Sequence, residues 1–284
     1  MAFENFREYK YHFTNCTGLY GMLKDYSTNN PFLTMWATHS AFMNDSSEYE
    51  YGKEMCMKVL KLYEERTKIP QKKSIFNDGE KRIEDFLTND APFLISLSSN
   101  IESAAMWGMY SSNGSGIALK FDIATLQKHS LLKRNDSIEP TSCIYCKNAD
   151  EILKKHEAYI GVLYSAIAHY YKLDNEDTIH KVLLYDIASQ IKHNSFEYED
   201  EHRIVVYKKN QNLQFRIRNN VIIPYIEVKV PIEALKGIIV GPTANYDYIK
   251  KSLDMFIDNL GDSPMMTPLS NFIDIKKSSI PYRG

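Results

Sequence analysis

The sequence predicts an α+β protein, and three observations lead to this class. Short stretches that alternate aromatic, branched and polar residues, as strands do, recur along the chain. Longer amphipathic stretches typical of helices lie among them, without the strict β-α-β alternation of a doubly wound sheet. Hydrophobic residues make up 44% of the 284 positions, which is enough for a full core, and no repeat or Pro/Gly-rich linker divides the chain. We therefore expect a single domain over residues 1–284.

The first half of the chain mixes both kinds of element. Strands are expected at 9–14, 32–38, 93–98, 117–121 and 142–145. Helices are expected between them, at 18–26, 46–67, 81–87 and 102–110. Thr17 is a suitable cap for the first of these helices, and Ser46 or Ser47 for the second.

The second half begins with a helical segment, 149–193, that we expect to be inserted before the C-terminal strands. It contains two expected helices, at 151–172 and 178–192. The Lys- and His-rich stretches 154–156 and 192–193 are typical of solvated helix faces. The remaining elements are expected as strands at 203–209, 221–230 and 237–241, a helix at 246–260 and a strand at 271–276.

The bulk composition limits the function classes. A net charge of -2 argues against a dedicated non-specific nucleic-acid binder but allows an enzyme that meets nucleic acid in a local groove. There is no apolar N-terminal stretch and no apolar run of roughly 18 residues, so we expect a soluble cytoplasmic protein that meets no membrane. Four cysteines without a regular framework indicate reduced thiols. Cys143 and Cys146 form a lone CxxC without further ligands, so no metal site is expected.

Four short motifs are candidates for chemistry, and the first is the sequence YHFTN at 11–15. His12 and Thr14 are two residues apart on an expected strand, so their side chains share one face. A neutral imidazole beside a hydroxyl is a donor and acceptor pair suited to ribose hydroxyls or an amide. The alternative is a histidine that is simply satisfied at the edge of the core.

The second motif is FMNDSSE at 42–48. Asn44 and Asp45, followed by Glu48, are ordinary residues for the start of a helix. In the functional interpretation the cap is also a pocket wall, with Asn44 binding a ligand and Trp36 or Phe42 stacking on a ring.

The third motif is WGMY at 107–110, followed by the turn NGSG at 113–116. Trp107 and Tyr110 are three residues apart and share one face of a helical turn. They either anchor the core before a tight loop or line a pocket. The glycine-rich turn is too short for a Walker loop or a Rossmann fingerprint.

The fourth motif is FEYEDEHR at 196–203. On a strand, Glu199, Glu201 and Arg203 would lie on one face. One carboxylate could stabilise a developing cation or bind a ribose hydroxyl, while the other polarises a nucleophile. The alternative is a solvated acidic turn in which Arg203 pairs with Glu201.

Taken in order, these motifs resemble a large bacterial family known only as a domain of unknown function. The usual form of that family reads HYT, NDPxE, CFS with WxxY, and WxYExExR. The resemblance covers residues 9–245, and its motifs correspond here to 12–14, 44–48, 96–98 with Trp107 and Tyr110, and 198–203.

This chain departs from the family pattern at three places. Ser96 and Leu97 replace the usual Cys-Phe pair, so a catalytic cysteine there is excluded for this chain. Ser46 stands where the family has proline, and Phe196 stands where it has a second tryptophan. These replacements keep the shape of pocket walls.

A more distant resemblance links the opening motif to ADP-ribosyltransferases of the DNA-modifying toxin type. It implies a split mixed or antiparallel sheet with flanking helices, and NAD as the substrate. It implies catalytic roles for Glu201, with Glu199 as the rival, and for His12. The residues that it implies for NAD binding are His12, Thr14, Trp36, Asn44, Trp107, Tyr110 and Arg203.

The function expected from this resemblance is a mono-ADP-ribosyltransferase, a toxin or phage-defence effector. Its acceptor would be nucleic acid or protein, and an antitoxin or regulatory protein is an expected partner. A non-catalytic nucleotide-sensing module is the alternative, and a metal hydrolase is the weakest candidate because the chain lacks a spaced ligand set.

Overall fold

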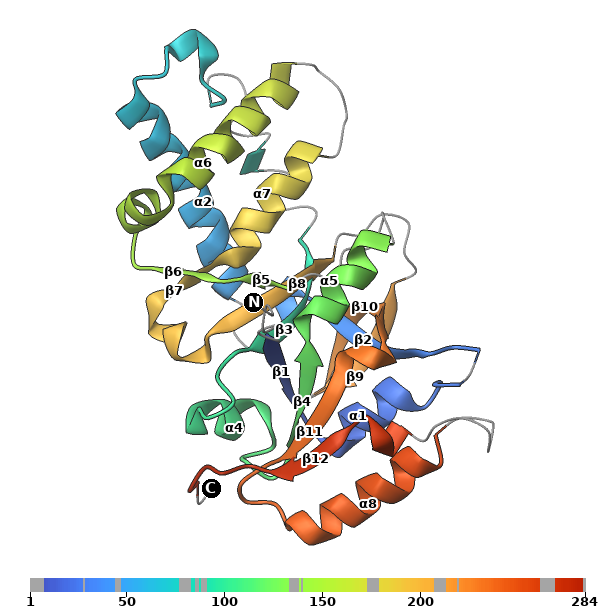
Figure 1. Cartoon of the computed structure of the whole chain (residues 1–284). Helices are drawn as coiled ribbons and strands as arrows, with labels where there is room; N and C mark the ends of the chain where they lie inside the picture. The colour runs from blue at the N-terminus through green and yellow to red at the C-terminus, as the bar shows by residue number, and fades with distance from the viewer. Residues whose placement is uncertain are drawn as a thin grey trace, which may run out of the picture.

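A computed structural model describes most of the chain. The described residues are 8–27, 29–43, 47–76, 83–84, 87, 91–132, 138, 140–172, 179–206, 213–218, 220–260 and 269–282. They form a large sheet with helices on both faces and a separate helical layer beside it (Figure 1). The α+β class predicted from the sequence is confirmed.

The main sheet has 10 strands. Eight of them follow the order β12 (Asp274–Lys277), β11 (Leu235–Val240), β4 (Ile117–Asp122), β1 (Tyr9–Thr14), β3 (Phe93–Ser98), β2 (Phe32–His39), β10 (Val221–Pro231) and β9 (Gln214–Arg218). Two more strands, β8 (Glu201–Val206) and β5 (Thr141–Ser142), join through β3, because β8 pairs with both β3 and β5. Only the β11–β12 pair in this sheet is parallel.

The sheet opens between β1 and β2. Both strands neighbour β3, but β2 pairs with it only at Phe93 and Leu94, and β1 pairs with it only at Ser98. On its other edge β3 pairs with β8 from Phe93 to Ser98. Residues 95–97 therefore have no strand partner on the β1 and β2 side, and a gap in the sheet results.

The two faces of the sheet carry different helices. Side chains of successive strand residues point to opposite faces, so Leu119 and Ala118 on β4 belong to different cores. The larger core packs the sheet against α1 (Cys16–Leu23), α5 (Ile123–Leu132) and α8 (Tyr246–Asp258). The smaller core packs the opposite face against α4 (Ala104–Tyr110).

A second hydrophobic core belongs to the helical layer. It is formed by α2 (Ser47–Thr67), α6 (Ala149–Lys172) and α7 (Ile179–Gln190), with the short parallel pair β6 (Ile144–Cys146) and β7 (Ile191–His193) at its base (Figure 1). The helical segment expected at 149–193 is thus joined by α2 from the first half of the chain. No helix in the described ranges is long and apolar enough to cross a membrane.

Several local expectations need correction. Asn15, not Thr17, caps α1, because its side chain accepts a hydrogen bond from the Gly18 N–H at 2.9 Å. The strand expected at 142–145 is divided between β5 and β6, which belong to different sheets. The last residues of the helix expected at 178–192 form β7 instead. The cap at 44–46 and most of the helix expected at 81–87 lie outside the described residues.

The helical layer depends on a close approach of α2 to α7 at Gly52. A Cβ atom at this position would lie 2.0 Å from the backbone oxygen of Ala188. We expect Gly52→Ala to lower the free energy of unfolding by about 1–3 kcal/mol because the two helices must separate. Gly21→Ala is the matched control, since its Cβ meets Trp36 at an ordinary 3.6 Å. Urea unfolding of both variants checks this, and equal stabilities would contradict it.

Candidate functional site

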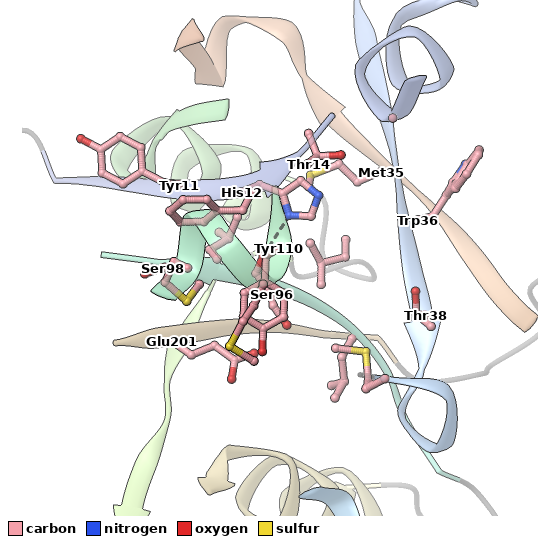
Figure 2. A pocket seen from close by; sticks show the side chains of 18 of the residues that line it. Tyr11, His12, Thr14, Met35, Trp36, Thr38, Ser96, Ser98, Tyr110 and Glu201 are labelled. Atoms are coloured by element: carbon pink, nitrogen blue, oxygen red, sulfur yellow. Dashed lines mark hydrogen bonds between the residues drawn. The ribbon is translucent and has the colours of Figure 1, made fainter. Parts of the chain in front are cut away.

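A cavity of about 470 Å³ lies where the sheet opens between β1 and β2. Figure 2 shows His12 and Thr14 on one side of the gap, Trp36 and Thr38 on the other, and Ser96 of β3 between them. Its size is within the range of small-molecule sites. The cavity has one end rich in carboxylates and another rich in arginine, and the two ends come from different parts of the chain.

His12 bridges the gap in the sheet. Its Nδ1 lies 3.0 Å from the carbonyl oxygen of Ser96. A carbonyl oxygen can only accept, so Nδ1 carries the proton and Nε2 keeps its lone pair. Burial lowers the pKa of His12, and Arg216 lowers it further, against the hydrogen bond to Ser96. His12 is therefore a neutral acceptor that lines the cavity.

The carboxylate end of the cavity is a buried cluster of four charged groups. Arg203 binds Glu201 with two hydrogen bonds, from Nε at 2.9 Å and from a terminal nitrogen at 2.8 Å. Lys192 Nζ joins the two carboxylates, at 2.5 Å from Glu199 Oε2 and 2.9 Å from Glu201 Oε2. The exposed fractions of these residues are 1% for Lys192, 1% for Arg203, 2% for Glu199 and 4% for Glu201. Two negative and two positive charges balance one another.

The two carboxylates of this cluster differ in their protonation. Burial would raise the pKa of Glu201, but Arg203 and Lys192 outweigh it and hold that pKa well below its usual range. Burial raises the pKa of Glu199, and the attraction of Lys192 offsets only part of this rise. Tyr110 donates a hydrogen bond to Glu199 Oε1 at 2.9 Å. Glu199 is therefore the carboxylate with room for a further hydrogen bond, while Glu201 is engaged at both oxygens.

The local backbone explains how both carboxylates reach the cavity. Glu199 ends a short 3-10 helix, Asn194–Glu199, and Asp200 adopts a left-handed conformation with φ 42°. The strand β8 begins only at Glu201, so the predicted row of three residues on one strand holds for Glu201 and Arg203 alone. Glu199 joins them through the turn at Asp200.

Lys192 corrects a prediction made from the sequence. The stretch 192–193 was expected on a solvated helix face, but α7 ends at Gln190 and Lys192 lies on β7, opposite Tyr145. It is buried against the two carboxylates and also lies 4.9 Å from the centre of the Phe196 ring. No local sequence signal marks it, because its place depends on strand pairing with β6.

The arginine end of the cavity lies on the other side of the gap. Arg216 of β9 is held over the ring of Trp36 at 5.2 Å and near that of Tyr225 at 5.8 Å. It donates a hydrogen bond to Thr38 Oγ1 at 2.8 Å. Arg218 lines the same cavity. Neither arginine was selected from the sequence, in which QFRIR reads as an ordinary strand.

The structure brings together most of the predicted site residues. Cavity-lining members of that set are His12, Thr14, Trp36, Tyr110, Glu199 and Glu201. Arg203 lies behind them, bound to Glu201 and to the Ser189 carbonyl oxygen at 2.7 Å. Asn44 lies outside the described residues.

Trp107 does not line the cavity. It is fully buried, packs edge-on against Phe13 and donates its indole N–H to the Ile101 carbonyl oxygen at 2.8 Å. This is the core anchor that was the alternative for the third motif. Among the described residues no group of three or more His, Cys, Asp or Glu side chains is arranged to hold a metal.

Comparison with known proteins supports a family of unknown function for part of the chain. Residues 106–204 match the family model described as Protein of unknown function (DUF2971). The match covers about a third of the chain, from α4 to β8, and includes Tyr110, Glu199 and Glu201 but not His12. No curated protein and no solved structure matches the chain.

The charge cluster predicts a pH-dependent penalty for losing its lysine. Lys192→Met leaves Glu199 buried without its cation, which we expect to lower the free energy of unfolding by about 3–5 kcal/mol at pH 8. Without Lys192 the pKa of Glu199 rises further above its unfolded value of about 4.3. A carboxyl with a raised folded pKa stabilises the fold at low pH and loses that effect as pH rises.

Urea unfolding at pH 5 and pH 8 therefore checks this prediction. The variant should approach the wild type at pH 5 and fall below it at pH 8. The double variant Lys192→Met/Glu199→Gln removes the stranded charge, and it should recover most of the loss at pH 8. A pH-independent deficit in the single variant would contradict the assignment.

Proposed function

We propose that this protein is an NAD-dependent mono-ADP-ribosyltransferase that modifies a macromolecule, nucleic acid or protein. The observation that carries the proposal is one cavity lined by a neutral histidine, a carboxylate with a raised pKa and, at its other end, two arginines. Such a cavity supplies groups for a ribose, for a developing cation and for phosphates. The opening of the sheet between β1 and β2 also agrees with the split sheet that the resemblance implies.

The reaction that we propose breaks the bond between the ribose C1′ and the nicotinamide nitrogen. The bonding electrons leave with nicotinamide, and the ribose becomes an oxocarbenium-like cation. A nucleophile of the acceptor then bonds to C1′ and releases its proton. Glu199 is placed to face this cation, because its oxygens keep free lone pairs after binding Tyr110 and Lys192. Glu201 acts as a positioning residue, because Arg203 engages both of its oxygens.

This assignment reverses the ranking that the sequence suggested, in which Glu201 was preferred. A carboxylate clamped by a bidentate arginine is strongly neutralised, and it offers less field to a ligand cation than one with a single lysine partner. The proposed biological setting is unchanged. It is a cytoplasmic toxin or phage-defence effector, with an antitoxin or regulatory protein as its partner.

The experiment that tests the proposal is release of nicotinamide from NAD by the purified protein. We expect Glu199→Gln to lower kcat about 10²-fold or more with little change in KM, because the lost charge acts mainly on the transition state. Glu227→Gln on β10 is the matched control, since this glutamate is exposed and does not line the cavity.

Two outcomes would overturn the proposal. One is turnover that persists in the double variant Glu199→Gln/Glu201→Gln. The other is saturable NAD binding without any product after long incubation with candidate acceptors, which would favour the non-catalytic nucleotide-sensing module. In that case Glu199→Gln should change affinity alone.

His12 predicts a pH profile for substrate binding. Its neutral Nε2 is the acceptor for a ribose hydroxyl or an amide, and its pKa lies below the ordinary value of about 6.5. We expect the KM for NAD to stay constant from pH 8 down to about 6.5 and to rise only at lower pH, where the imidazole gains a proton. A KM that rises between pH 8 and pH 7 would contradict this role, and His12→Ala should remove the acid rise.

A further inference from the structure

Arg216 is a partly desolvated cation without an acidic partner. Its guanidinium is packed over Trp36 and Tyr225, and its printed protein hydrogen bond goes to the hydroxyl of Thr38. Its Nε atom is buried and has no hydrogen-bond partner among the described residues. No carboxylate of the described ranges lies within salt-bridge distance of it. A buried charge in this condition is unfavourable until an anion arrives.

The charge around Arg216 points in the same direction. Burial lowers the pKa of Arg216, and the neighbouring charge of Arg218 lowers it further. Both arginines line the cavity. At the far end the two carboxylates are balanced by Lys192 and Arg203, so the uncompensated charge of the cavity is positive and lies on β9.

A second element adds to this field. Asn15 and Gly18 at the N-terminus of α1 line the same cavity. The N-terminus of a helix carries a partial positive charge and favours phosphate groups. Two arginines and a helix start therefore act on one cavity.

We propose that Arg216 is the anchor of a diphosphate subsite, which binds the two linked phosphates of a nucleotide ligand. A guanidinium fork matches phosphate oxygens, and a doubly charged anion matches two neighbouring arginines better than a single carboxylate does. Arg203, the arginine that the fourth motif offered for this task, is occupied by Glu201 and Ser189. The subsite rests on the proposed function for the identity of the whole ligand, but its affinity for a diphosphate does not depend on catalysis.

The test is titration calorimetry of the full-length protein with inorganic pyrophosphate at low ionic strength. We expect saturable binding by the wild type and binding that is roughly ten-fold or more weaker in Arg216→Gln, as for the loss of a charge-assisted hydrogen bond. Arg216→Lys keeps the charge without the fork and should give an intermediate affinity. Thermal unfolding without ligand confirms that each variant is folded.

Lys229→Gln is the matched control. This lysine lies on β10, the neighbour of β9, and donates to Thr34 Oγ1 at 2.6 Å much as Arg216 donates to Thr38. The control removes the same charge outside the cavity and should bind pyrophosphate like the wild type. Equal affinity of Arg216→Gln and the wild type would overturn the proposal, as would a wild type that does not bind pyrophosphate.

Two further arms separate this subsite from other interpretations. Malonate, a dicarboxylate, should bind more weakly than pyrophosphate, and equal or tighter malonate binding would overturn the phosphate assignment. Glu199→Gln should bind pyrophosphate normally although it loses turnover. Pyrophosphate binding without any nicotinamide release would thus retain the subsite while the proposed reaction fails, and the reverse pattern would overturn the subsite alone.

Discussion

The burial of two glutamates between a sheet and a helical layer is the constraint on which this structure depends. An unpaired buried carboxylate is strongly unfavourable, so both cations must come into place when the layers meet. Arg203 comes from β8 and Lys192 from β7, and Arg203 also binds the Ser189 carbonyl oxygen on α7. The cluster therefore joins the two cores through hydrogen bonds whose loss would leave charges stranded. Hydrophobic packing alone would allow the layers to slide, whereas this geometry selects one arrangement.

The same cluster sets the chemistry of the cavity. Lys192 contacts both carboxylates, and the difference between them comes from Arg203, which binds only Glu201. One carboxylate stays ionised and fixed, while the other keeps a raised pKa and free lone pairs. Two adjacent acids with separated pKa values are a common basis for acid and base roles. Here the separation follows from one extra arginine.

The local parts of the fold could be predicted from the sequence because local periodicity controls them. Alternation placed β1, β2 and β3 within a residue or so of their observed ends, and the spacing of two residues put Glu201 and Arg203 on one face. The third motif shows the limit of this reasoning. Helical spacing placed Trp107 and Tyr110 together, but a neighbour such as Phe13, 94 positions away, decides that Trp107 is core.

The missed residues share a physical cause. Lys192 is buried because residues 191–193 leave the helix to pair with β6, and Arg216 lines the cavity because β9 follows β10 at the edge of the gap. Both facts are long-range pairings that leave no trace in a window of ten residues. The gap itself has the same origin. Along most of their length β1 pairs with β4 and β2 pairs with β10, so β3 is left to span them.

The two ends of the cavity are therefore under different constraints. The carboxylate end is part of the contact between two cores, so a change there disturbs both stability and chemistry. The arginine end lies on an edge hairpin, where Phe215 and Ile217 are exposed and little packing depends on Arg216. A change at Arg216 should alter ligand binding while the fold is retained. Ligand preference can then vary along β9 without loss of the buried cluster, which is what a scaffold that meets different ligands requires.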